Sequence, residues 1–225
     1  MNEGQKAPPA KHQVTNPKLL LWVLMIVYVL NFLDRQIVNI LAEPISRDLG
    51  LSDTQIGLLT GLAFALFYTL LGIPIARYAD NSGTNRVGLI SISLAVWSAM
   101  TALCGLAQNF AQLALTRVGV GVGEAGCTPA AHSLITDSVP AEKRSSAIAF
   151  YGLGIPIGSL LGLVIGGVLN DTYGWRVAFM VVAIPGLILA ALLPFILREP
   201  RKAEAAARAL SGEQARAVLS TKAAL

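Results

Sequence analysis

The stretch WRVAFMVVAIPGLILAALLPFIL occupies residues 175–197 and carries a single charged residue, Arg176. A helix that spans the hydrocarbon core of a bilayer needs about 20 mainly apolar residues. A run of this length and composition therefore predicts a transmembrane helix rather than a core helix of a soluble domain.

Five further runs upstream reach the same length. Their interiors show no period-2 alternation and are rich in Leu, Ala, Gly and Ile, which favours helices over the strands of a membrane barrel. The six predicted spans are Leu19–Ala42, Ile56–Ala79, Val87–Leu106, Phe110–Ile135, Ala147–Leu169 and Trp175–Leu197. We therefore expect an all-α integral membrane protein with six transmembrane helices in one bundle.

The overall composition agrees with this expectation. Charged residues make up 13% of the chain, against about 25% in soluble domains. Each charge at the bilayer centre costs roughly 2.5–3.5 kcal/mol on insertion scales, which explains the deficit. The two cysteines, Cys104 and Cys127, fall in or near apolar spans and show no disulfide framework or metal-ligand spacing. We expect neither a cofactor nor a metal.

Basic residues predict the orientation. If the N-terminus is cytoplasmic, the segments on that side hold most of them: Lys6, Lys11, Lys18, Arg77, Arg86, Lys143, Arg144, Arg198, Arg201, Lys202, Arg208, Arg216 and Lys222. The outer loops hold Arg47 and Arg176 alone, and this asymmetry obeys the positive-inside rule. Both termini are predicted to be cytoplasmic, in a multi-pass protein of a bacterial inner membrane, and the net charge of +4 gives no reason to invoke nucleic acid.

The chain divides into three predicted parts. Residues 1–17 form a cytoplasmic segment, residues 18–197 the transmembrane bundle, and residues 198–225 a cytoplasmic tail or the start of a linker to a second half. The connection Glu43–Gln55 is predicted to be an outer loop. Within it, Ser52 is expected to cap a helix, because a glutamine follows three residues later.

Four charged residues lie well inside the predicted spans, away from their ends: Asp34, Arg35, Arg117 and Glu124. Because the bilayer penalises such residues, each is a candidate for function, with a structural ion pair as the alternative. Counting about 1.5 Å per residue places them at similar depths, so the first and fourth spans could meet there. Glu124 has no charged residue one turn away on its own span and is the better candidate for a proton carrier.

Glycine recurs every four residues along the fifth span, at Gly154, Gly158, Gly162 and Gly166. Such a row lets another helix approach closely, either as static packing or as a surface that slides. Gly121-Val-Gly123-Glu-Ala-Gly126 fits a dinucleotide-binding pattern, but no strand precedes it and it lies in a span, so we interpret it as helix packing. Pro74, Pro129, Pro156 and Pro185 each interrupt a span and are expected to bend it.

Together these residues resemble the major facilitator superfamily, and within it the spinster-like lysolipid transporters. The resemblance covers about residues 18–200. The stretches that carry it are Asn31-Phe-Leu-Asp34-Arg35, Ala76-Arg-Tyr-Ala-Asp80-Asn-Ser-Gly83-Thr-Asn-Arg86, Arg117-Val-Gly119-Val-Gly121-Val-Gly123-Glu124, Pro140-Ala-Glu-Lys143-Arg144 and the glycine row. The family's loop motif has a glycine where this chain has Ala76.

The resemblance implies roles for several residues. Asp80, Gly83 and Arg86 would form the loop that locks one conformation, and Asp34, Arg35, Arg117 and Glu124 would line the central cavity and couple it to protons. It also implies a 3+3 inverted repeat within the six helices and two such bundles in a complete transporter. The chain would then be an N-terminal half that needs a C-terminal half or a second copy.

We therefore expect a proton-coupled secondary transporter that works by alternating access and is not an enzyme. Its substrate would be a lysolipid-like or other amphipathic organic anion, with sugar acids left open, and its partners would be protons and membrane lipids. The alternative is a non-transporting membrane scaffold that uses its glycine-rich helix faces for assembly.

Overall fold

The computed structural model describes residues 16–81 and 83–201. The parts predicted to be a cytoplasmic N-terminal segment and tail lie largely outside these ranges, in residues 1–15 and 202–225. Within the described residues the regular structure is entirely helical, as predicted. The helices are α1 (Pro17–Leu49), α2 (Asp53–Gly57), α3 (Ala63–Asp80), α4 (Arg86–Cys104), α5 (Phe110–Glu124), α6 (Cys127–Ser138), α7 (Arg144–Gly152), α8 (Gly154–Tyr173) and α9 (Trp175–Ile196), with a π-helical turn at Leu58–Leu62 and a 3-10 turn at Ala141–Lys143.

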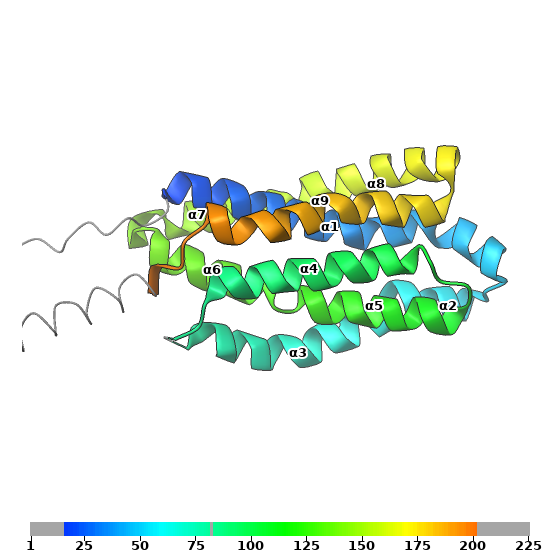
Figure 1. Cartoon of the computed structure of the whole chain (residues 1–225), viewed down its shortest axis with the longest axis horizontal. Helices are drawn as coiled ribbons and strands as arrows, with labels where there is room; N and C mark the ends of the chain where they lie inside the picture. The colour runs from blue at the N-terminus through cyan, green and yellow to red at the C-terminus, as the bar shows by residue number, and fades with distance from the viewer. Residues whose placement is uncertain (1–15, 82, 202–225) are drawn as a thin grey trace, which may run out of the picture.

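The helices run along the long axis of the molecule (Figure 1). The start of α1 and the end of α9 lie at one end of the bundle, together with the connection from α3 to α4; we call this the termini end. The connections α1–α2, α4–α5 and α8–α9 lie at the other end, which we call the opposite end.

The first helix is longer than the apolar run that predicts it. α1 continues to Leu49 and ends at Gly50, whose φ of 63° is left-handed and whose backbone N–H bonds to the Ser46 carbonyl. The prediction of a loop at Glu43–Gln55 is therefore wrong over most of that range, which is helical. The length of an apolar run indicates how much of a helix lies in lipid, and a helix can continue beyond it. The cap predicted at Ser52 is confirmed: Ser52 and Gln55 form a reciprocal capping box that starts α2.

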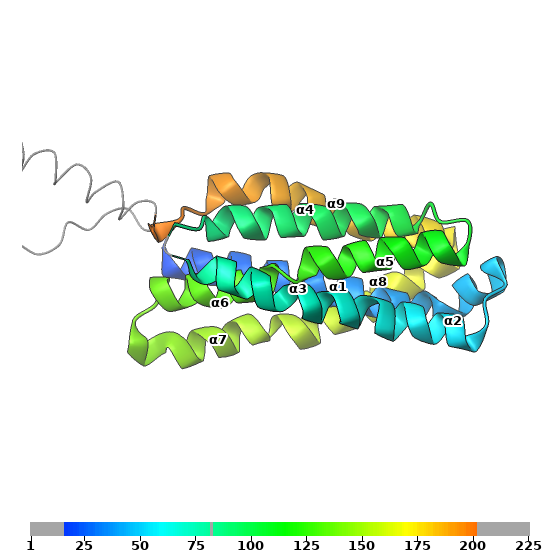
Figure 2. The same ribbon diagram turned by 90° about the horizontal axis from the view of Figure 1, so that it is seen from below.

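The fourth predicted span is divided. α5 ends at Glu124, a turn follows at Ala125 and Gly126, and α6 begins at Cys127, with the two helices nearly end to end (Figure 2). Among the described residues five helical stretches are long and apolar enough to cross a membrane, and this divided one is not among them. The count of six spans and the 3+3 repeat therefore stay predictions.

Proline accounts for where two of the breaks fall. Pro129 is the third residue of α6, and Pro156 is the third residue of α8. Each of these helices begins directly after a turn residue. Proline has no N–H to bond the carbonyl four residues back, but the first turn of a helix does not need that bond. The spans are therefore interrupted immediately upstream of each proline.

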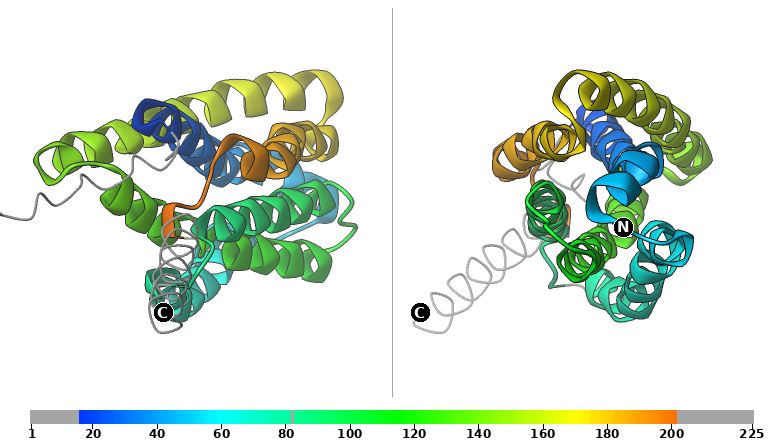
Figure 3. Two further views of the ribbon diagram at one scale, coloured as in Figure 1. Left: turned by 60° about the vertical axis from the view of Figure 1, so that its left-hand side comes forward. Right: turned by 90° about the vertical axis from the view of Figure 1, so that its right-hand side faces the viewer.

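The glycine row of α8 packs against α1. The two helices lie side by side in the end-on view of Figure 3. A Cβ added at Gly158 would lie 2.3 Å from the Val29 carbonyl oxygen, and one at Gly162 would lie 2.8 Å from that of Leu33. The two helix backbones are thus in direct contact along the row. A partner protein could use this face only by displacing α1, which counts against the scaffold alternative.

Two apolar clusters form the core. The cluster nearer the termini end includes Leu24, Trp97 and Val120, and the cluster nearer the opposite end includes Leu41 and Leu113. Polar side chains that are buried, except for the partly exposed Arg35, lie along α1, α4 and α5, and we call them the polar layer: Asn31, Asp34, Arg35, Thr101, Arg117 and Glu124.

Candidate functional site

The polar layer contains an ion pair that joins α1 to α5. Arg35 Nε donates to Glu124 Oε2 at 2.7 Å, with the Arg35 side chain 25% exposed and the Glu124 side chain fully buried. The first and fourth predicted spans therefore meet at the level of these residues, as their depth predicted. Glu124 lacks a charged neighbour on its own helix but obtains one from α1.

Asp34 lies one residue before Arg35 and is held differently. Thr101 Oγ1 of α4 donates to Asp34 Oδ2 at 2.5 Å, and Asp34 is buried. Asp34 Oδ1, Glu124 Oε1 and both polar atoms of the Asn31 amide are buried without a hydrogen-bond partner among the described residues. Buried polar groups without partners are costly, so this layer has unused capacity for hydrogen bonds.

Arg117 adds a buried cation to the layer. Its Nε and Nη1 have no hydrogen-bond partner among the described residues, and its guanidinium carbon lies 5.5 Å from the centre of the Phe64 ring. The Arg35 guanidinium carbon lies 4.8 Å from the same ring and 4.7 Å from that of Tyr68. Phe64 therefore contacts both guanidinium groups, whose charges an aromatic face attracts.

The structure thus gathers all four predicted intramembrane residues into one layer. It holds two guanidinium groups and two carboxylates, and several of their polar atoms are free to bind a proton, a water or an anionic group. Sequence reasoning missed Phe64, Tyr68 and Thr101, because aromatic and hydroxyl side chains are common in membrane helices. Among the described residues, no group of three or more His, Cys, Asp and Glu side chains is placed to hold a metal ion.

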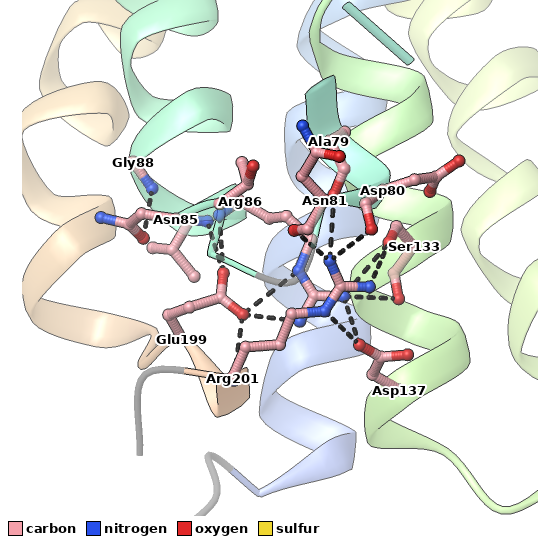
Figure 4. Close-up of polar contacts among 12 residues, drawn as sticks. Ala79, Asp80, Asn81, Asn85, Arg86, Gly88, Ser133, Asp137, Glu199 and Arg201 are labelled. Carbon is pink, nitrogen blue, oxygen red and sulfur yellow. Dashed lines mark hydrogen bonds and ion pairs between the residues drawn. The ribbon is translucent and has the colours of Figure 1, made fainter. Parts of the chain in front are cut away.

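A second polar site lies at the termini end and is centred on Arg86, the first residue of α4 (Figure 4). Its fully buried guanidinium pairs with Glu199 at 2.5 Å and with Asp137 at 2.7 Å. The Glu199 carboxylate also accepts from the backbone N–H groups of Arg86 at 2.6 Å and Val87 at 3.3 Å. It therefore bonds free N–H groups at the start of α4, where the helix dipole favours a negative charge.

Arg201 connects this site to α3 and α6. Its Nε donates to Asp137 Oδ2 at 2.8 Å, and its Nη1 donates to the backbone carbonyls of Ala79, Asp80 and Asn81 at 3.2, 3.2 and 2.9 Å. We call Arg86, Ser133, Asp137, Glu199 and Arg201 the termini cluster. It ties the ends of α3, α4 and α6 to the segment after α9.

The predicted lock residues differ in how they take part. Arg86 is the centre of the termini cluster, whereas the Asp80 side chain is exposed and points away from it, so only the Asp80 carbonyl contributes. Gly83 has open space where a Cβ would be. Glu199 and Arg201 were missed, because charged residues of either sign are ordinary just after a last span and Arg201 also fits the positive-inside pattern. Their immediate position after Leu197 is the one signal that could have found them.

The electrostatics of Asp137, at the last turn of α6, follow from its neighbours. Burial alone would raise the pKa of its carboxyl, but hydrogen bonds and charge from Arg86 and Arg201 lower that pKa below its usual value. Asp137 is therefore charged at neutral pH and bridges the two arginines.

Comparisons with known proteins agree with this architecture. The sequence profile of the Major Facilitator Superfamily matches residues 24–224. An MFS-type efflux pump of Mycolicibacterium smegmatis is 42% identical over 78% of this chain and 40% of its own length. The probable sphingolipid transporter spinster homolog 1 of Arabidopsis thaliana is 30% identical over 88% of this chain and 43% of its own length.

A solved structure is similar as well. The crystal structure of a bacterial homolog to the human lysosomal transporter spinster, in an inward-facing and unoccupied conformation, matches with a TM-score of 0.77 and 41% identity. The match covers 82% of this chain and 43% of that one. The chain thus spans less than half the length of these relatives, which are transporters and not enzymes.

Proposed function

The chain belongs to the Major Facilitator Superfamily and is spinster-like, and from that premise we propose that it is the N-terminal half of a proton-coupled secondary transporter. The observation that carries the proposal is the Arg35–Glu124 ion pair, which joins α1 and α5 between the two apolar clusters. A buried pair of this kind is a costly way to fix two helices, because desolvation opposes the Coulomb attraction. If the pair opens and closes during transport, it has a role that explains why a pair with this desolvation cost is present.

In the proposed cycle, a proton reaches Glu124 and removes its charge. Arg35, which is partly exposed, is then released from its partner and can bind an anionic substrate group. Asp34 retains the Thr101 hydrogen bond in either state, and Arg117 supplies a second cation, whose Nε and Nη1 have no hydrogen-bond partner among the described residues. When Glu124 releases the proton on the other side of the membrane, the Arg35–Glu124 pair forms again and the anion is displaced. Proton movement and anion movement are therefore coupled.

We infer that the substrate is an amphipathic organic anion. Two guanidinium groups with free hydrogen-bonding capacity suit an anionic head, and aromatic rings beside them suit an apolar portion. The Arabidopsis relative is named as a probable sphingolipid transporter, which favours a lysolipid-like substrate. Sugar acids, which have no apolar chain, are the competing class.

The termini cluster is the proposed conformational lock. Arg86, Asp137, Glu199 and Arg201 tie the ends of α3, α4 and α6 to the segment after α9 at one face of the membrane, and we propose that they act together with the predicted loop residues Asp80 and Gly83. We propose that this face is cytoplasmic and that the membrane is a bacterial inner membrane, since the basic residues concentrate there. Residues 18–197 would form the six-helix bundle, and the missing surface would be supplied by a C-terminal half or a second copy.

The test is uptake by the complete protein in proteoliposomes, driven by a pH gradient, with a fluorescent lysophosphatidylglycerol and a hexuronate as separate probes. Glu124→Gln should abolish the stimulation by the gradient, because this variant cannot take up the proton, and Asp34→Asn should weaken it, because Asp34 is the second buried carboxylate of the layer. Glu43→Gln alters an exposed carboxylate farther along α1 and should leave uptake unchanged. Gradient-driven uptake that persists in both intramembrane variants would refute the coupling.

A further inference from the structure

A groove at the termini end lies outside both polar sites. It has a volume of about 760 Å³ and is formed by the first turns of α1, the connection after α6 and the first turns of α7. Its walls are mainly apolar: Leu21, Trp22, Val139, Pro140 and Phe150 line it. The Trp22 and Phe150 rings meet edge to face at 5.0 Å, which fixes the wall between α1 and α7.

The rim of this groove is basic. Lys18 from α1 and Lys143 from the 3-10 turn both line it, and no acidic residue is among the described residues that do. Both lysines are exposed, so their ammonium groups are accessible to a ligand. A ligand that fits must therefore combine negative charge at the rim with apolar chains along the walls.

We propose that this groove binds an anionic phospholipid of the surrounding bilayer leaflet, with the phosphate between Lys18 and Lys143 and an acyl chain against Trp22 and Phe150. The groove opens at the end of a membrane-spanning bundle, where headgroups lie. Trp22 and Leu19 are exposed on the first turns of α1. Basic residues at this level attract anionic lipids, and tryptophan is enriched there.

The parts of the chain outside the described residues are poorer candidates to fill this groove. Residues 1–15 carry Lys6 and Lys11 against Glu3, and residues 202–225 carry Lys202, Arg208, Arg216 and Lys222 against Glu204 and Glu213. Both segments are net basic, so two lysines at the rim repel them. Charge complementarity therefore favours an anionic lipid.

Trp22 makes the proposal measurable without any transport assay. It is 55% exposed, whereas Trp97 and Trp175 are 1% and 5% exposed, so quenching by lipid reports mainly on the groove. The chain is reconstituted in phosphatidylcholine vesicles that contain brominated phosphatidylglycerol or, separately, brominated phosphatidylcholine. Trp22→Phe defines the background signal. We expect stronger quenching by the anionic lipid, and a smaller preference for it at high salt.

The variants separate the groove from general surface charge. Lys18→Gln with Lys143→Gln should lower the relative affinity for phosphatidylglycerol, on the order of five-fold for each lysine. Arg77→Gln removes an exposed cation on α3 that does not line the groove, and should leave the preference intact. Helical circular dichroism checks that each variant is folded.

Three results would overturn the proposal. One is equal quenching by the two lipids at low salt, which needs no variant. Another is a loss in Arg77→Gln that matches the loss in the lysine pair, because the effect would then be general surface charge. The third is displacement of the lipid by soluble glycerol phosphate at equal concentration, because the apolar walls would then contribute nothing.

Discussion

Glu124, Asp34 and Glu199 are buried carboxylates with different partners. Glu124 is paired with a guanidinium, Asp34 accepts from a hydroxyl, and Glu199 binds two backbone N–H groups as well as Arg86. A hydroxyl can reorient when its partner is protonated, whereas a guanidinium and an N–H group can only donate. Protonation therefore disrupts the partners of Glu124 and Glu199 but can be accommodated around Asp34.

Asp137 predicts how the termini cluster responds to acid. Its pKa in the folded chain lies below the ordinary 3.8, owing to Arg86 and Arg201. A depressed pKa stabilises the fold above the unfolded-state pKa, and that contribution is lost as the pH falls through the folded-state value. We expect the melting temperature in detergent to be steady from pH 7 to about pH 5 and to fall below about pH 4.

Asp137→Asn should lower the melting temperature at pH 7 and reduce its fall in acid, since the variant has no carboxylate there to protonate. Asp171→Asn alters an exposed carboxylate at the opposite end and serves as the control. An acid response in Asp137→Asn as large as in the unaltered chain would show that other groups cause it.

The four charged residues of the polar layer were predictable from sequence, whereas of the termini cluster only Arg86 was. Asp34, Arg35, Arg117 and Glu124 stand out because each is costly in an apolar run, and counting residues from the ends of the runs gives their depth. Glu199 follows a span, where charges are ordinary, and its partner Arg86 is more than a hundred residues away. Only the packing of α4 against α9 brings the two together.

At the scale of the helices, apolar length predicts the spans well and their ends poorly. α1 extends seven residues past its apolar run because a helix needs no lipid once its backbone bonds are made within it and Gly50 caps it. The break after Glu124 escapes a hydropathy count because Gly126 and Pro129 interrupt the backbone without making the run polar. The spacing of the glycines in α8 predicted that another helix would pack there, but it did not identify α1 as that helix.

The contact between α1 and α8 predicts opposite effects for two glycines on one helix. Gly158→Ala places a Cβ 2.3 Å from a backbone oxygen, so the helices must separate, and unfolding should become easier by about 1–3 kcal/mol. Gly167→Ala meets nothing within 4 Å and should be neutral or stabilise by about 0.5–1 kcal/mol, because alanine favours helix.

The measurement for this pair is reversible unfolding in mixed detergent micelles, followed by circular dichroism. Equal effects of the two substitutions would mean that helix propensity, and not the contact with α1, sets the response.

At the scale of the whole molecule, polar clusters tie the helices together at both ends. At the opposite end, Asp48 on α1 pairs with Arg176 and accepts from Trp175 Nε1 at 3.2 Å, while Arg176 also donates to the Ala107 carbonyl at 3.1 Å. With the termini cluster at the other end, the bundle is constrained along its length. We therefore expect it to move as one body against a second half.

Glu199 tests the dependence of the bundle on its termini end. Glu199→Gln removes one of the two carboxylates that pair with the fully buried Arg86. Leaving a buried charge with no partner costs about 3–5 kcal/mol, and because Asp137 remains we expect a loss below that range. We expect a lower unfolding midpoint and faster protease cleavage between α3 and α4. Glu142→Gln, at an exposed site in the 3-10 turn, is the matched control, and an equal effect there would refute the role of the buried pair.

The length of α1 has a consequence for access from outside the membrane. Its 33 residues extend for about 50 Å at 1.5 Å per residue, whereas a hydrocarbon core is about 30 Å thick. We therefore expect the last turns of α1 and the Asp48–Arg176 pair to extend beyond the hydrocarbon core as a rigid helical projection. In the proposed orientation, with both termini cytoplasmic, Arg47→Cys would be labelled by membrane-impermeant maleimides in intact cells, and labelling only after the cells are opened would contradict that orientation.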